Sequence, residues 1–183
     1  GVTVLGAVLG GTLVGASLGL FNGVMITRFK VPPFVATLAM LTIARGGTKL
    51  YTGGEAITGL GDTFAQIGSG RLLGIPNQAL IAALIVGGTA ILLKRTRFGR
   101  HIYAVGGNEE AAKLSGLNVH RIKLKVYSIA GALSAVGALI LTSKLNSATP
   151  VAGEGYELDS IAAVVIGGTS LSGGRGSVFG TVL

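Results

Sequence analysis

Residue types that carry out catalysis or bind metals are scarce in this sequence. It contains no cysteine and two histidines, His101 and His120, and neither has an acidic residue or a cysteine at the spacing of a metal site. No Ser-His-Asp set and no pair of carboxylates is recognisable. The glycine-rich segment 167–180 lacks both the G-x-x-x-x-G-K-[ST] phosphate motif and a preceding strand pattern. We therefore expect a chain that is not an enzyme and that binds no metal and no cofactor itself.

The most specific local pattern lies in segment 108–116. Asn108 is a good N-cap residue, and Glu109 and Glu110 follow it in the first turn, where negative charge suits the helix dipole. Gly116 suits the left-handed position that follows a helix. These residues predict a short helix over about 109–115. Because such a short helix is marginal alone, we expect it to dock on the rest of the protein or on a partner.

Composition indicates that these elements belong to a membrane protein. Hydrophobic residues make up 49% of the 183 residues and charged residues 12%, against about 25% charged in average soluble domains. The long apolar runs predict membrane spans at about 2–27, 34–50, 79–93 and 126–143. The last stretch, 160–183, is interrupted by glycines and predicts a broken or re-entrant helix. The expected fold is therefore an all-α, polytopic transmembrane bundle, with 1–183 as one partial membrane domain.

Charge gives the expected orientation. The net charge is +8, and eight of the fifteen basic residues lie in segment 94–125, between two long apolar runs. This placement favours a cytoplasmic loop over a nucleic-acid-binding domain. With 94–125 inside, two loops that hold five of the seven acidic residues fall outside. Gly1 is not a start methionine and both ends lie within hydrophobic runs, so we also expect a chain truncated at both ends.

Within the spans, small residues are candidates for helix packing, and uncharged polar residues are candidates for a substrate pathway. Glycine recurs at every fourth position of the first run and predicts a packing face at Gly11, Gly15, Gly19 and Gly23. The few polar residues within the runs are candidates for a substrate pathway: Asn22, Thr37, Thr42 and Ser128. Asp159 is expected to cap the helix that follows it.

Two segments resemble a known family. Glu110-Ala111-Ala112 followed by Gly116 fits the E-A-A-x-x-x-G pattern of importer permeases. The wider run 99–116 and the segment 156–176 resemble the ribose/xylose/galactose-type permeases of ATP-binding-cassette (ABC) importers. The resemblance extends over about 29–183 and is strongest in these two segments.

The resemblance implies that the short helix is a coupling helix that sits in a groove of an ATPase subunit. It assigns this coupling role to the following residues: Arg100, Asn108, Glu109, Glu110, Ala111, Ala112 and Gly116. It also implies a bacterial inner-membrane permease that moves a monosaccharide. The implied partners are cytoplasmic ATP-binding subunits that hydrolyse the ATP, a periplasmic sugar-binding protein and a second permease copy or homologue.

An alternative function from another class is a secondary transporter or channel that needs no ATPase, since broken glycine-rich helices also occur there. Such proteins usually place ionisable residues within their spans. Here only Arg45 and Lys49 lie within an apolar run, which favours the importer permease.

Overall fold

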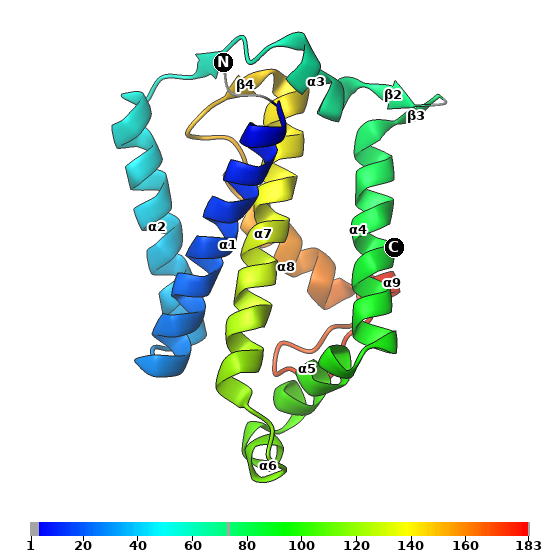
Figure 1. Cartoon of the computed structure of the whole chain (residues 1–183). Helices are drawn as coiled ribbons and strands as arrows, with labels where there is room; N and C mark the ends of the chain where they lie inside the picture. The colour runs from blue at the N-terminus through cyan, green and yellow to red at the C-terminus, as the bar shows by residue number, and fades with distance from the viewer. Residues whose placement is uncertain (1–3, 73, 183) are drawn as a thin grey trace. The chain divides into compact units, whose positions relative to one another are not determined.

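The computed structural model describes residues 4–72 and 74–182, and the predicted span residues Val2, Thr3 and Leu183 lie outside this part. The helices are α1 Val4–Arg28, α2 Pro33–Thr52, α3 Asp62–Ser69, α4 Asn77–Arg95, α5 Arg97–Gly107, α6 Glu109–Leu114, α7 Val119–Leu145, α8 Tyr156–Ile166 and α9 Val178–Val182 (Figure 1). The strands have two residues each: β1 Ile57–Thr58, β2 Arg71–Leu72, β3 Ile75–Pro76 and β4 Ser147–Ala148. The strand pairs β1–β4 and β2–β3 are antiparallel. The predicted all-α class is confirmed.

Three of the described helices are long and apolar enough to cross a membrane: α1, α4 and α7. Each has at least 19 residues, close to the roughly 20 that span a bilayer. Helix α2 has 20 residues but carries Arg45 and Lys49 in its second half. These helices agree with the apolar composition and identify a membrane protein.

The chain divides into two compact units. One comprises Gly1–Leu80 and Lys123–Ala152, and the other comprises Ile81–Ile122 and Gly153–Leu183. Two of the three boundaries between the units fall within α4 and α7, so each unit contains part of both helices.

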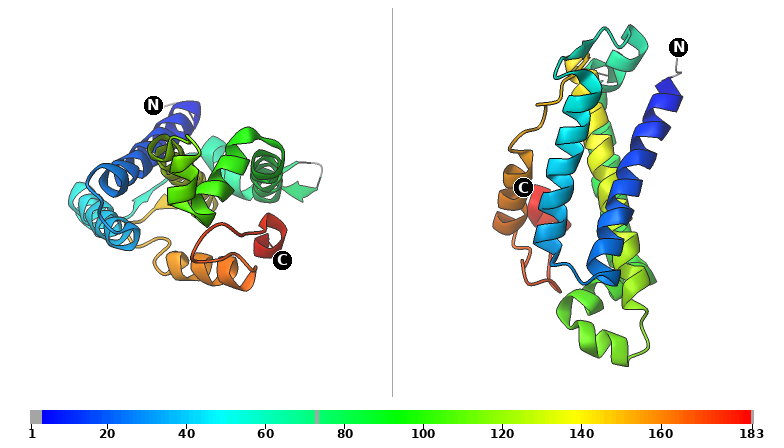
Figure 2. Two further views of the ribbon diagram at one scale, coloured as in Figure 1. Left: turned by 90° about the horizontal axis from the view of Figure 1, so that it is seen from below. Right: turned by 90° about the vertical axis from the view of Figure 1, so that its left-hand side faces the viewer.

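In the first unit, α1 and α7 run antiparallel and close together (Figures 1 and 2). A Cβ atom built on Gly15 would lie 2.5 Å from both the Gly131 carbonyl oxygen and the Ala135 Cβ. One built on Gly19 would overlap the Tyr127 carbonyl oxygen. The two neighbouring positions in the series, Gly11 and Gly23, face Leu139 and Leu124 of α7. The glycines predicted to form a packing face thus lie against α7, where a side chain would separate the helices.

The segment between α2 and α4 is tied to the end of α7 within the same unit. Ser143 is completely buried, and its hydroxyl accepts a hydrogen bond from the Gly68 amide at 2.8 Å. The same hydroxyl donates to the Phe64 carbonyl. Ser143 of α7 therefore holds the short helix α3 in place.

In the second unit, the C-terminal helix is broken as predicted. Helix α8 ends at Ile166, the left-handed Gly168 follows, and α9 begins at Val178. A Cβ atom on Gly167 would lie 2.6 Å from the Gly180 carbonyl carbon, so the two short helices contact each other through backbone. Close backbone contact stabilises a broken helix whose pieces are too short to be stable alone.

One expectation about a helix end is wrong, and segment 94–125 is more helical than expected. Asp159 does not cap α8, because the helix begins at Tyr156 after the left-handed Gly155 and Asp159 lies inside its first turn. Segment 94–125 contains more than the single short helix that was predicted. Helix α5 precedes that helix, and α7 begins at Val119 rather than near residue 126, with the Asn118 side chain accepting a hydrogen bond from the Arg121 amide at 3.0 Å.

Candidate functional site

The elbow between α4 and α5 positions the rest of segment 94–125. Thr96 is the N-cap of α5, and its hydroxyl accepts a hydrogen bond from the Gly99 amide at 3.1 Å. A Cβ atom on Gly99 would overlap the carbonyl oxygen of Leu93 and lie 2.5 Å from that of Leu92. Only glycine therefore lets α5 turn back so tightly on the end of α4.

Helix α6 has defined caps at both ends. The Asn108 side chain accepts a hydrogen bond from the Ala111 amide at 2.9 Å. At the other end Gly116 has a φ of +82°, its amide bonds the Lys113 carbonyl, and the Leu117 amide bonds the Ala112 carbonyl. This is the Schellman arrangement, which needs glycine at the left-handed position. The predicted capped helix is confirmed, with α6 ending at Leu114 and Ser115 as its C-cap.

The two faces of α6 differ. Ala112 is 6% exposed, and α6 packs on α5. The opposite side is open, and Leu114 is 89% exposed. The other residues of segment 109–116 are exposed too: Glu109, Glu110, Ala111, Lys113, Ser115 and Gly116. Because burying a leucine side chain stabilises by about 1.5–3 kcal/mol, this exposed leucine suits a face that another molecule covers.

The last turn of α5 is in backbone contact with loop 169–177. A Cβ atom on Gly106 would lie 2.7 Å from the Gly174 amide nitrogen, and one on Gly174 would lie 2.6 Å from the Gly107 Cα. Gly173 has a φ of +87° and faces the Gly106 carbonyl. Two glycine pairs about 65 residues apart in sequence therefore form one tight joint. The sequence shows both pairs but not that they meet.

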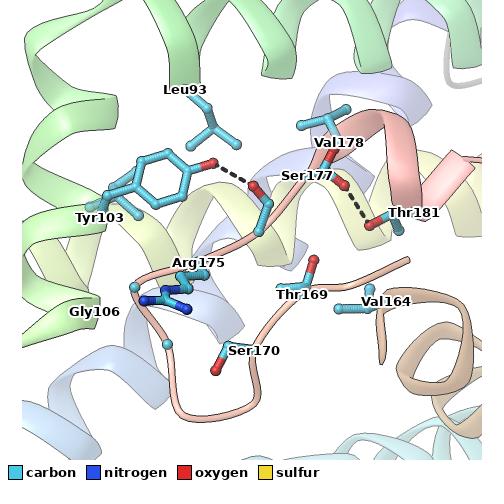
Figure 3. Close-up of a pocket in the computed structure, with 14 residues that line it drawn as sticks. Leu93, Tyr103, Gly106, Val164, Thr169, Ser170, Arg175, Ser177, Val178 and Thr181 are labelled. Carbon is cyan, nitrogen blue, oxygen red and sulfur yellow. Dashed lines mark hydrogen bonds between the residues drawn. The ribbon is translucent and has the colours of Figure 1, made fainter. Parts of the chain in front are cut away.

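A cavity of ≈ 370 Å³ lies beside this joint, within the second unit (Figure 3). Tyr103 of α5 points across it, and its hydroxyl donates a hydrogen bond to the Gly176 carbonyl at 3.3 Å. The Thr181 hydroxyl of α9 bonds the Ser177 carbonyl at 3.0 Å. Loop 169–177 thus has contacts with α5 on one side, and with α9 at its end.

A second cavity, of ≈ 560 Å³, lies in the first unit and is lined by α1, α2 and α7. Two of the four predicted pathway residues, Asn22 and Thr37, line it. The other two do not. The Thr42 hydroxyl bonds the Leu38 and Ala39 carbonyls of its own helix, and the Ser128 hydroxyl bonds the Ala16 carbonyl of α1 at 3.2 Å.

Tyr127 also lines the second cavity, and it was not among the predicted pathway residues. A signal for it existed in the sequence, because a tyrosine within an apolar run carries a polar hydroxyl that needs a partner. Its placement opposite Gly19 and Gly23, however, required the pairing of α1 with α7.

The remaining predicted residues lie in helices as well. Arg100 is exposed in α5, and one guanidinium nitrogen, Nη1, donates to the Thr96 carbonyl at 3.4 Å. His101 is in α5 and His120 is exposed in α7. Across residues 4–72 and 74–182, no group of three His, Cys, Asp or Glu side chains is arranged to hold a metal ion.

Comparison with known proteins gives a family match over the whole chain. Residues 1–183 match the family described as branched-chain amino acid transport system / permease component. No solved structure matches.

Curated relatives are similar over most of this chain. The ribose import permease protein RbsC of Bacillus subtilis (strain 168) is 55% identical over 88% of this chain and 51% of its own length. The protein of the same name from Escherichia coli (strain K12) is 45% identical over 100% of this chain and 58% of its own length. The galactose/methyl galactoside import permease protein MglC of Haemophilus influenzae is 44% identical over 92% of this chain and 52% of its own length. The chain spans about half the length of the curated relatives it matches.

Proposed function

Because this chain belongs to the permease-component family of branched-chain amino acid transport systems, we propose that it is part of the membrane-spanning permease subunit of an ABC importer. The proposed substrate is a monosaccharide of the ribose or galactose type, since the relatives named above are import permeases for ribose and galactose. The chain itself catalyses no reaction, and a partner subunit hydrolyses the ATP. A secondary transporter or channel that works without an ATPase is the competing function.

Helix α6 is the observation that supports ATPase coupling best. It is short, capped at both ends, held on α5, and open on the side that carries Leu114. A rigid helix with one exposed apolar residue suits insertion into a groove of a partner. We propose the exposed face of α6 as the contact with the ATPase, with Gly116 and Asn108 setting its ends. Arg100 lies at the beginning of the preceding helix, and its proposed coupling role rests on the family resemblance.

The proposed setting is the bacterial inner membrane, with 94–125 in the cytoplasm. The further partners are a periplasmic sugar-binding protein and a second permease copy or homologue. The cavity between α1, α2 and α7 supports a substrate pathway through the first unit, because it brings Asn22 and Thr37 together. Thr42 and Ser128 have less support, since their hydroxyls are bonded to the backbone elsewhere.

The coupling role is tested in the full-length permease expressed with its ATPase and binding protein. Glu110→Lys reverses a charge in the first turn of α6, and Gly116→Arg places a side chain at a φ of +82°. We expect each change to reduce co-purification of the ATPase and ATP-driven ribose uptake by about tenfold or more, a loss of about 1.4 kcal/mol in association. Leu114→Ala should weaken ATPase association without destabilising the permease, because the Leu114 side chain is exposed and makes little contact with the rest of the chain.

Leu158→Ala is the matched control, since Leu158 is 68% exposed on α8, outside segment 94–125. It should leave ATPase association unchanged. Normal uptake and normal association in both Glu110→Lys and Gly116→Arg would refute the coupling assignment. Uptake that continues after ATP depletion would instead support the transporter or channel.

A further inference from the structure

Polar side chains on α1, α2 and α7 differ in whether they have hydrogen-bond partners within the protein. The Thr37 hydroxyl bonds the Pro33 and Phe34 carbonyls at 2.9 and 3.1 Å. The Thr42 and Ser128 hydroxyls are bonded to backbone as well. Within the described part of the chain, the amide of Asn22 and the hydroxyls of Tyr127 and Ser134 have no hydrogen-bond partner.

Asn22, Tyr127 and Ser134 all line the same cavity. Asn22 is half-buried on α1, and Tyr127 is half-buried on α7. The Tyr127 Cβ would lie 3.3 Å from a Cβ on Gly23, the residue next to Asn22, so the two helices are in contact at this level. An amide or hydroxyl in an apolar helical bundle is unfavourable unless it is hydrogen-bonded. A ligand or water in the cavity can supply partners that the described residues do not.

The chemistry of the lining selects the class of ligand. Among the described residues, no Asp, Glu, Lys or Arg lines the cavity, so a charged solute finds no counter-ion there. The amide of Asn22 and the hydroxyl of Tyr127 each donate and accept hydrogen bonds, which matches a solute whose hydroxyls do both. The tyrosine ring adds an apolar face for C–H groups. The volume of ≈ 560 Å³ lies in the range of small-molecule sites, about 300–1,000 Å³.

We propose that Asn22 and Tyr127 form a hydrogen-bonding site for a neutral, polyhydroxylated solute of monosaccharide size in the α1/α2/α7 cavity. This rests on the proposed import function and adds to it a site made by two named side chains. Asn22 supplies the amide, and Tyr127 supplies the hydroxyl and the ring. Thr37 contributes an acceptor lone pair, since its proton is donated to its own helix.

The test uses the full-length permease with its ATPase and binding protein in proteoliposomes, with radiolabelled ribose and galactose as probes. Asn22→Leu keeps the size of the side chain and removes the amide, and Tyr127→Phe removes the hydroxyl alone. We expect each to lower ATP-driven uptake of the transported sugar three- to tenfold while ATPase association and ATP hydrolysis persist. Thr48→Val is the matched control, because the Thr48 hydroxyl is exposed and bonds only the Ala44 carbonyl of its own helix, and it should transport normally.

A second measurement tests sugar binding at the site independently of transport. Asn22→Cys should react with a small water-soluble thiol reagent, and ribose or galactose should slow this reaction at least threefold. Normal uptake by both Asn22→Leu and Tyr127→Phe would overturn the site and leave the import function intact. A cysteine at position 22 that reacts only with membrane-partitioning reagents would show a lipid-filled cavity and also overturn it. Absence of ATP-driven uptake by the unmodified permease would contradict the import function, whereas sugar protection of this cysteine would still support the site.

Discussion

The polar residues in the helices show what a single residue can be predicted to do. The sequence identifies serines and threonines within apolar runs but not the acceptors of their hydroxyls. Thr12 and Thr42 bond carbonyls of their own helices, whereas Ser143 and Ser128 bond other segments. The difference depends on which helix lies beside each residue, and that is set by packing far along the chain. For this reason, only two of the four predicted pathway residues, Asn22 and Thr37, line the cavity of the first unit.

Ser143 allows the strongest prediction at this scale. Ser143→Ala removes both hydrogen bonds of a fully buried hydroxyl and leaves the Gly68 amide without that partner. We expect a loss of about 1–3 kcal/mol of stability, because an unsatisfied buried donor carries its full desolvation cost. The measurement is the thermal unfolding midpoint in detergent. Ser160→Ala is the control, since the Ser160 hydroxyl is exposed and bonds only the Tyr156 carbonyl of its own helix. Equal midpoints for the two variants would contradict the role given to Ser143.

Helices with strong local signals were predicted well. The ends of α6 follow from Asn108 and Gly116, because caps depend on neighbouring residues in the sequence. Helix α5 was missed because three of its eleven residues are glycine, which has a low helix propensity. Those glycines are used for close contacts with Leu92 and Leu93 and with loop 169–177. Tertiary contact therefore outweighs local preference in α5, and such contact is not visible in the sequence.

The glycine joint between α5 and loop 169–177 gives a prediction about one element. Gly106→Ala would place a Cβ atom 2.7 Å from the Gly174 amide nitrogen, so the loop must move away. Arg175 lies in this loop, and its release should increase the rate of trypsin cleavage after Arg175 about threefold or more in detergent-solubilised protein, because proteolysis follows local opening. Gly87→Ala is the matched control, since a Cβ atom on Gly87 of α4 would meet nothing within 4 Å. An unchanged cleavage rate in Gly106→Ala would show that the joint does not hold the loop.

For the molecule as a whole, composition predicts the long helices, and charge predicts an orientation in the membrane that the fold itself does not show. The apolar runs predict the long helices to within a few residues, except that α7 begins earlier than expected. Hydrophobicity alone determines such elements, because a bilayer requires long apolar helices. The proposed orientation of the chain across the membrane rests on the basic residues of 94–125 alone.

This orientation can be tested with two matched cysteines that lie before and after α4 in the sequence. Ser69 and Ser115 are both exposed, and each hydroxyl bonds a carbonyl four residues earlier, at Ala65 and Ala111. Ser69→Cys and Ser115→Cys are therefore equivalent substitutions in the full-length permease freed of other cysteines. We expect a membrane-impermeant thiol reagent to label position 69 in intact spheroplasts and position 115 only after permeabilisation. The reason is that α4 carries Lys94 and Arg95 in its last turn, and basic residues are retained on the cytoplasmic side. Labelling of position 115 before position 69 would invert the topology and would place α6 where no cytoplasmic ATPase could reach it.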